Sequence, residues 1–333
     1  MIQKILTCLL SAVLLLTVSL AQAQQPAKKI PRIGFLTPIS ASDPQSALRL
    51  DAFRQGLRDL GYVEGKDINI EYRYAEGRPE RLPALAEELV RLKVDIFVVA
   101  NDATARAAKK STATIPIVMA QSGNPIGSGV IASLARPGSD VTGLTSYTAE
   151  LLGKRLELLK EVVPKVSRFA FLNTADTAAT ASGDAFKEAQ GPAKVLGVQF
   201  KLVEVKAENP DIEGAFRIIA KERIGAVITS PVPFIFFHRK RILERLGKNR
   251  IPAMHSQQEW TNAGGLMSYG ANIPDLYRRA ARYVDKILKG AKPAELPVEQ
   301  LTKFEFVINL KTAKQIGVTI PPNVLLRVDK VIR

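Results

Sequence analysis

The segment Arg32-Ile33-Gly34-Phe35-Leu36 decides the fold, because the similar segment Arg168-Phe169-Ala170-Phe171-Leu172 follows at an offset of 136 residues. Two further pairs keep that offset: Leu60-Gly61 with Leu196-Gly197, and 115–121 with 251–257. Each match alone is weak, but a strand, a helix-end glycine and a second strand at one spacing are typical of a duplicated unit. The sequence therefore predicts two similar lobes and a cleft between them.

Short apolar runs alternate with amphipathic stretches along the chain, which is the pattern of βαβ units around parallel sheets. We predict an α/β fold of two doubly wound parallel-sheet lobes joined by hinge crossovers. The predicted strands are 32–36, 67–72, 95–100, 117–120 and 141–144, then 168–173, 199–205, 226–230, 253–255 and 266–269. The predicted helices are 45–60, 80–92, 103–111, 151–163, 183–196, 212–222, 239–246, 275–288 and 311–316.

The N-terminus has a basic start, an apolar run from Ile5 to Leu20 and an Ala21-Gln22-Ala23 site, which is typical of a secretory signal peptide. A membrane anchor is the alternative, but the run is shorter than the ~20 residues of a membrane span. We predict a signal peptide at 1–23 and a periplasmic mature protein. Cys8, the only cysteine, lies in that segment, so the mature chain would have no disulfide.

The remaining chain is long enough for two domains that each bury their own core. We assign 30–146 and 270–293 to the first lobe, and 147–269 and 294–333 to the second. Removing the signal takes away only Lys4, which leaves 46 basic and 32 acidic residues. This excess suits an anionic partner, but export argues against nucleic acid. We interpret the basic run at 239–250 as a solvated helix face.

A set of ordered motifs carries a family resemblance. They are Ile33-Gly34-Phe35, Gly65–Arg73, Ile115-Pro116-Ile117-Val118, Asn124-Pro125-Ile126-Gly127 and Arg136-Pro137-Gly138. The whole mature chain resembles the substrate-binding proteins of ABC importers, in the group that includes tryptophan-type binding proteins. The resemblance implies the type I periplasmic binding fold, three crossovers, and closure on a small ligand that is handed to a permease in the inner membrane. The chain departs from the family's pattern at two places: Asn124, where many relatives carry Asp, and the unusually apolar stretch 234–237.

Candidate ligand-binding residues follow from the rule that ligands collect outside the carboxyl ends of parallel strands. Hydroxyl and amide side chains at helix starts can hold a carboxylate, whereas Asp102, Asp176 or Glu259 could accept an ammonium group. Ordinary helix capping is the alternative for each polar residue, and core packing is the alternative for the tyrosines. The nominated residues are Thr37, Ser42, Asn101, Asp102, Gln121, Asn124, Ser146, Tyr147, Asn173, Ser230, His255, Gln257, Glu259 and Tyr269.

The repeat also pairs Gln121 with Gln257 and Met119 with His255, and we expect these pairs to face each other across the cleft.

The sequence carries few signs of catalysis, since the chain has two histidines and no metal-binding, P-loop or nucleophile-elbow motif. We predict no enzyme activity, no cofactor and no metal.

The leading hypothesis is a monomeric periplasmic solute-binding component of an ABC importer, with an amino acid, an aromatic or another carboxylate as ligand. The sequence leaves open a periplasmic ligand sensor for a membrane receptor. A more remote alternative is a secreted hydrolase that uses His255, Ser256 and Glu259. A repressor of the same fold is not expected, because no DNA-binding headpiece precedes Arg32.

Overall fold

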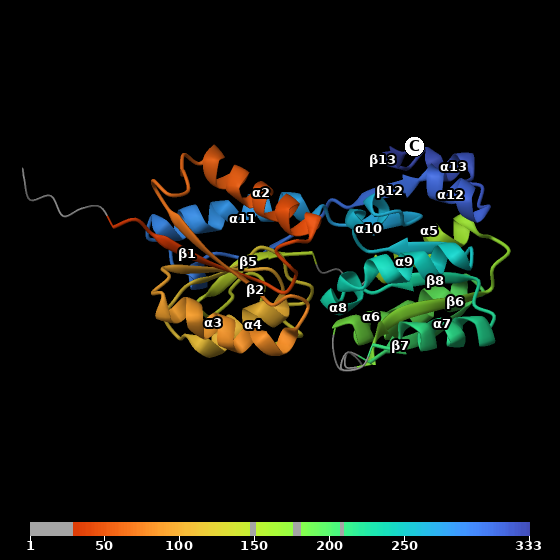
Figure 1. The fold of residues 1–333 in the computed structure, drawn as a ribbon, viewed down its shortest axis with the longest axis horizontal. Coiled ribbons are helices and arrows are strands. Elements are labelled where there is room, and N and C mark those ends of the chain that lie inside the picture. The colour runs from red at the N-terminus through yellow and green to blue at the C-terminus, as the bar shows by residue number, and fades with distance from the viewer. Residues whose placement is uncertain (1–28, 147–150, 176–180, 207–209) are drawn as a thin grey trace, which may run out of the picture.

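The computed structural model describes residues 29–146, 151–175, 181–206 and 210–333. Two α/β lobes lie side by side (Figure 1). The predicted signal peptide, Tyr147 and Asp176 lie outside the described residues. Within the described ranges, no helix has the length and apolar character needed to span a bilayer.

The first lobe is built on a six-stranded sheet of order β11-β5-β4-β3-β1-β2, in which every pair is parallel. Apolar side chains of α2 and α11 cover one face of this sheet, and those of α3 and α4 cover the other. The strands are β1 (Arg32–Thr37), β2 (Asn69–Tyr74), β3 (Ile96–Val99), β4 (Ile117–Met119), β5 (Val141–Thr145) and β11 (Glu299–Gln300). The helices are α2 (Pro44–Asp59), α3 (Leu82–Arg91), α4 (Asp102–Ser111) and α11 (Ile273–Leu288).

The second lobe has a seven-stranded sheet of order β13-β12-β10-β9-β8-β6-β7, with one antiparallel pair, β10 and β12. Helices α5, α6, α12 and α13 pack on one face, and α7 to α10 supply the other core. The strands are β6 (Arg168–Thr174), β7 (Gln199–Val205), β8 (Ala226–Thr229), β9 (Ala253–His255), β10 (Met267–Gly270), β12 (Glu305–Asn309) and β13 (Lys330–Ile332). The helices are α5 (Leu151–Val162), α6 (Ala181–Val195), α7 (Ile212–Lys221), α8 (Pro233–Phe237), α9 (Arg239–Lys248), α10 (Gln258–Asn262), α12 (Leu310–Ile316) and α13 (Pro322–Leu325).

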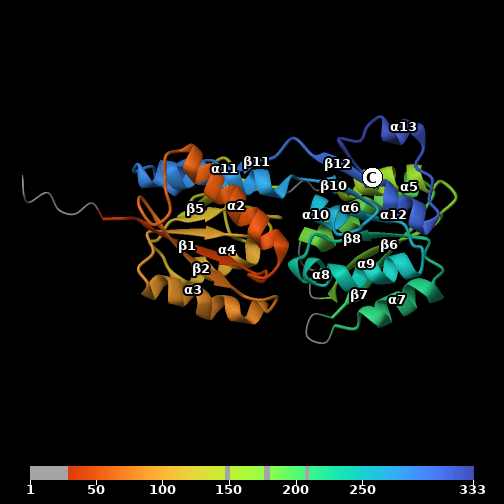
Figure 2. The same cartoon turned by 45° about the horizontal axis from the view of Figure 1, so that its top comes forward.

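The two-lobed α/β fold confirms the predicted fold class. The chain passes between the lobes after β5, after β10 and after β11 (Figures 1 and 2). One detail differs from the sequence assignment, which placed 294–333 in the second lobe. Strand β11 pairs with β5 in the first sheet, Glu299 opposite Leu144 and Gln300 opposite Thr145. The final crossover therefore begins only after Gln300.

The duplication is visible in the strand orders, since β2-β1-β3-β4-β5 has the same arrangement as β7-β6-β8-β9-β10. The offset is not constant, however. It is 136 residues between the starts of β1 and β6 and of β4 and β9, but 130 residues for β2 and β7 and for β3 and β8. The second half therefore has six fewer residues before β7 and six more between β8 and β9. Helix α8, which the sequence prediction missed, lies in that longer connection.

Close packing of α2 on α11 depends on a glycine. A Cβ at Gly56 would lie 2.1 Å from the carbonyl oxygen of Arg278 and 2.9 Å from the Cβ of Ala281. We expect Gly56→Ala to lower the free energy of unfolding by about 1–3 kcal/mol, because two helices must separate. The matched control is Gly247→Ala in α9, where a Cβ would meet nothing within 4 Å. It should raise stability by up to about 1 kcal/mol. Urea denaturation tests both, and equal responses would contradict the close-packing explanation.

Candidate functional site

Two of the predicted ligand-binding residues serve local turns. The Asn101 side chain accepts a hydrogen bond from the Thr104 N–H at 2.9 Å, and Thr104 Oγ1 accepts one from the Asn101 N–H at 2.9 Å. This reciprocal pair caps the N-terminus of α4. Asn124 Oδ1 accepts from the Gly127 N–H at 2.8 Å. For both residues the structure shows the capping or turn role that sequence reasoning held as the alternative.

Asp102 holds the loop that follows β4. Its carboxylate accepts hydrogen bonds from the N–H groups of Gly123 and Asn124, at 3.0 and 2.9 Å, and from the hydroxyl of Ser122. Ser146 Oγ lies 3.3 Å from the carbonyl oxygen of the same Ser122. Both carboxylate oxygens of Asp102 are thus engaged within the first lobe. Asp102 positions the loop in this structure.

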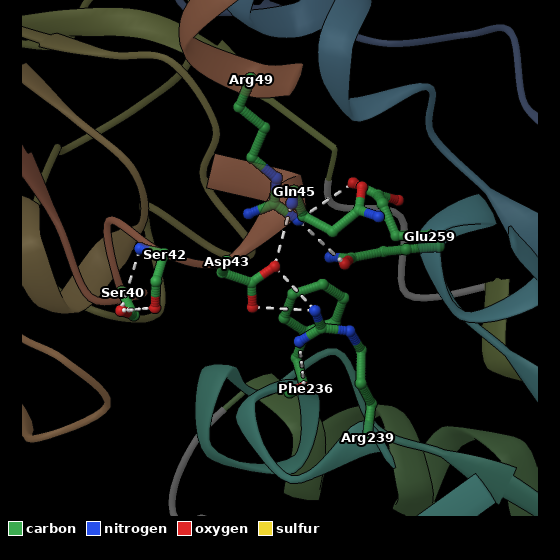
Figure 3. A network of polar contacts seen from close by, with 9 residues as sticks. Ser40, Ser42, Asp43, Gln45, Arg49, Phe236, Arg239 and Glu259 are labelled. Carbon is green, nitrogen blue, oxygen red and sulfur yellow. Dashed lines mark hydrogen bonds and ion pairs between the residues drawn. The ribbon is translucent and has the colours of Figure 1, made fainter. Parts of the chain in front are cut away.

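A buried cluster of charged side chains joins the lobes (Figure 3). Asp43 caps the N-terminus of α2 by accepting from the Gln45 N–H at 2.9 Å. Its two carboxylate oxygens also accept from Nη2 of Arg239, at 2.7 and 2.8 Å, across the interface. The side chains of Arg239 and Asp43 are only 6% and 12% exposed. This ion pair ties the start of α2 to the start of α9.

A second buried ion pair lies beside the first. Arg49 Nη2 donates to Glu259 Oε1 at 3.0 Å and to Gln257 Oε1 at 3.3 Å. Burial alone would lower the pKa of Arg49, but the neighbouring charge of Glu259 raises it above its ordinary value. Sequence analysis nominated Gln257 and Glu259 and missed Arg49. The helical spacing of the sequence could have indicated that Arg49 is buried, because it lies on the same side of α2 as Leu50 and Phe53.

The ring of Phe236 lies against both arginines. Its centroid is 5.1 Å from the Arg49 Cζ and 4.4 Å from the Arg239 Cζ, within the range of cation–π contacts. Arg239 Nη1 also donates to the carbonyl oxygen of Phe236 at 3.1 Å. We call Asp43, Arg49, Phe236, Arg239 and Glu259 the interlobe latch. Sequence analysis treated Arg239 as part of a solvated face, whereas the residue is 5% exposed.

His255 lies inside the second lobe. Its ring stacks on Trp260 with centroids 4.5 Å apart, and its Nδ1 lies 2.9 Å from the Thr229 hydroxyl. Burial lowers the pKa of His255 to about 3. Met119 is fully buried in a core of the first lobe. The expectation that these two residues face each other across a cleft is corrected: each packs within its own lobe.

The other nominated residues lie near strand ends in different settings. Thr37, Asn173 and Ser230 are buried, and the Ser230 hydroxyl has no hydrogen-bond partner in the part of the chain that the structure describes. Ser42 bonds to Ser40 at 2.9 Å in a turn, and Gln121 is half-buried. Tyr269 packs on Phe304 and Phe306, with centroids 6.0 and 6.2 Å away. The tyrosine thus packs against aromatic side chains of its own lobe.

A surface hollow of about 600 Å³ lies within the second lobe between α9 and α12, and His255 is among the residues that line it. Lys240, Leu246, Gly265 and Ile316 line it, and none of its lining residues belongs to the first lobe. Among the described residues no cluster of three or more His, Cys, Asp or Glu side chains could hold a metal ion. The strand ends and the interlobe latch therefore remain the best candidate site.

Comparison with known proteins agrees with this geometry. Residues 35–332 match the family described as ABC transporter substrate binding protein. The chain belongs to this family. A Streptococcus pneumoniae ABC domain solved in complex with L-Trp superimposes with a TM-score of 0.80, at 26% identity, over 90% of this chain and 100% of that chain. A conserved domain protein from Vibrio cholerae has a TM-score of 0.83 at 25% identity, over 91% of this chain and 100% of that chain.

A sequence relative among substrate-binding proteins is the tyrosine-binding protein of Clostridioides difficile. It is 25% identical over 264 residues, which are 79% of this chain and 74% of the relative. The family membership and these neighbours confirm the predicted resemblance. The solved neighbours also share the type I periplasmic binding fold that the sequence predicted.

Breaking the interlobe latch should favour separation of the lobes. In Arg239→Met, Asp43 would remain buried without its cation, and opening the interface would return its carboxylate to water. We expect a larger radius of gyration in small-angle scattering. Arg241→Met is the matched control, because Arg241 lies on the same helix and pairs with Glu213 of its own lobe. An unchanged radius for Arg239→Met would show that the latch does not hold the lobes together.

Because His255 is buried, the folded protein should become less stable as the pH decreases. The folded-state pKa of about 3 lies below the ordinary 6.5, so between these values the unfolded chain binds the extra proton. Stability is therefore lost as pH falls below 6.5, by roughly 2 kcal/mol between pH 7 and pH 5. In His255→Gln this component should disappear from urea titrations at the two pH values. His238→Gln, at the other histidine, is the comparison: burial also lowers the pKa of His238, but by less, so this variant should keep most of the pH response. An identical pH response in wild type and His255→Gln would contradict the prediction.

Proposed function

We propose that this protein is the periplasmic solute-binding component of an ABC importer and captures a small organic ligand between its lobes. Family membership supports the substrate-binding role. The N-terminal pattern at 1–23 supports export, and a permease in the inner membrane is the expected partner. The relatives named for tyrosine and bound to L-Trp favour an amino acid, aromatic or other carboxylate as ligand.

The interlobe latch is the observation that carries this proposal. It joins α2 of the first lobe to α9 and α10 of the second through two buried ion pairs, and to α8 through the Phe236 ring. Such an interface has two distinct arrangements, paired and closed or hydrated and open. A ligand that contacts both lobes shifts the population toward the closed form, which the permease recognises.

We assign the chain no catalytic role and no cofactor. A hydrolase would need His255 as a base, but its ring is fully buried against Trp260 and its pKa is lowered to about 3. A neutral histidine with so low a pKa is a weak proton acceptor near neutral pH. Ligand capture without turnover is the function that fits these side chains.

Thermal shift and calorimetry against amino acids and aromatic carboxylates test the proposal. A ligand at 100 times its Kd should stabilise the folded protein by about 2.7 kcal/mol. Trp260 contacts Phe236 of the latch, with ring centroids 6.1 Å apart, so its fluorescence should report closure. A lack of any stabilisation across the panel, with the protein folded, would overturn the proposed function.

A further inference from the structure

The carboxyl ends of four strands in the second lobe place polar residues in one row. Leu172 pairs with Thr229, Ile228 with Met254, and His255 with Ser268. Continuing this parallel register aligns Asn173, Ser230, Ser256 and Tyr269. Side chains alternate between faces, so the row lies on the same face as Phe171, Ile228, Met254 and Met267. Those apolar residues share a core with α5, and hence α5 covers the row.

Two neighbouring members of the row have free hydroxyl groups. Ser230 is fully buried and Ser256 is 3% exposed. Within the described ranges, neither Oγ has a hydrogen-bond partner. A buried hydroxyl without a partner has lost its hydrogen bonds to water and has no protein hydrogen bond to offset that cost. The two serines therefore present unused donors beneath the N-terminal part of α5.

Arg155 of α5 brings a positive charge to the same edge. The residue is 7% exposed, and its Nε donates to the carbonyl oxygen of Tyr269 at 2.8 Å. A Cβ at Gly270 would lie 3.4 Å from Arg155 Nη2 and 1.9 Å from the Ser256 carbonyl oxygen. The guanidinium thus approaches the end of β10 beside Ser256, where Gly270 leaves room for it.

Arg155 differs from the other buried arginines in having no acidic partner. Arg49 pairs with Glu259, and Arg239 pairs with Asp43. Among the described residues no carboxylate forms an ion pair with Arg155. Burial lowers the pKa of Arg155 to about 10. A buried cation is strongly unfavourable without a counter-charge. A bound anion would supply the counter-charge that the Arg155 guanidinium lacks.

We propose that Arg155, Ser230 and Ser256 form a subsite that binds the carboxylate of the captured ligand. The guanidinium supplies charge-assisted donors and the two serines supply hydroxyl donors. One cation balances one negative charge, so the subsite favours a monocarboxylate over a phosphate or sulfate dianion. This inference rests on the proposed function and names the ligand group that the second lobe recognises.

Calorimetry with matched probe pairs tests the subsite. The pairs are L-tyrosine with tyramine, L-tryptophan with tryptamine, and benzoate with benzamide; inorganic phosphate is a further arm. The wild-type protein should bind a carboxylate at least tenfold more tightly than its carboxylate-free partner, and it should bind phosphate more weakly than the carboxylates. Arg155→Met should weaken carboxylate binding by about 10- to 100-fold, in keeping with the loss of a charged hydrogen bond. It should leave the carboxylate-free probes unchanged.

Two further variants separate loss of the subsite from loss of structure. Arg155→Lys keeps the charge and should retain more of the carboxylate preference than Arg155→Met. Arg106→Met removes an exposed arginine of α4 and should bind like wild type. The subsite proposal would be overturned if the wild type bound a carboxylate and its carboxylate-free partner equally, or if Arg155→Met kept full carboxylate affinity. The proposed function would remain intact in both cases. Failure of the folded wild type to bind any probe would overturn the proposed function itself.

Discussion

Two arginines from opposite lobes share one phenylalanine ring, and the buried contact between the lobes is built around that ring. Arg49 reaches across from α2 and Arg239 approaches from α9, each with a carboxylate partner and Phe236 between them. Charges removed from water are stable only when every partner is present. Partial separation would leave charges neither paired nor hydrated, so the paired arrangement resists small displacements of the lobes. Under the proposed function, opening of the lobes would break these pairs together.

The latch also explains how a duplicated scaffold became asymmetric. The second half has six additional residues between β8 and β9, and α8 with Phe236 lies there. The first half has its six additional residues between Gly61 and β2, in a connection whose Gly65 adopts φ 84°. The two halves therefore have the same strand order, but the connections between their strands differ in length. One of these length differences, the longer connection between β8 and β9, supplies an element that meets the other lobe.

Strand and helix positions were largely predictable because buried parallel strands are continuous apolar runs and the long helices are amphipathic. Helices α8 and α10 were missed because five residues are too few to show helical periodicity. Strand β11 has two exposed residues and depends on pairing with β5, which no local pattern reveals. The rule about strand ends nominated Gln257 and Glu259 as ligand-binding residues, and in the structure both accept hydrogen bonds from Arg49 of the other lobe. It failed for His255 because side-chain alternation directs that ring into the core beneath Trp260.

Charged residues on helices were the hardest to interpret from sequence. Arg239 belongs to a basic run that was read as solvated, and only the tertiary structure shows it buried against Asp43. Its helix also carries the exposed Arg241, so composition alone cannot separate the two roles. The informative property is the partner of each buried charge. Latch arginines are neutralised by carboxylates of this chain, and they therefore contribute to closure whatever the ligand is. Among the described residues Arg155 has no such partner, and under the proposed subsite the ligand carboxylate supplies the negative charge. Under these two proposals, closure and ligand discrimination rest on different arginines, so either property could change during evolution without the other.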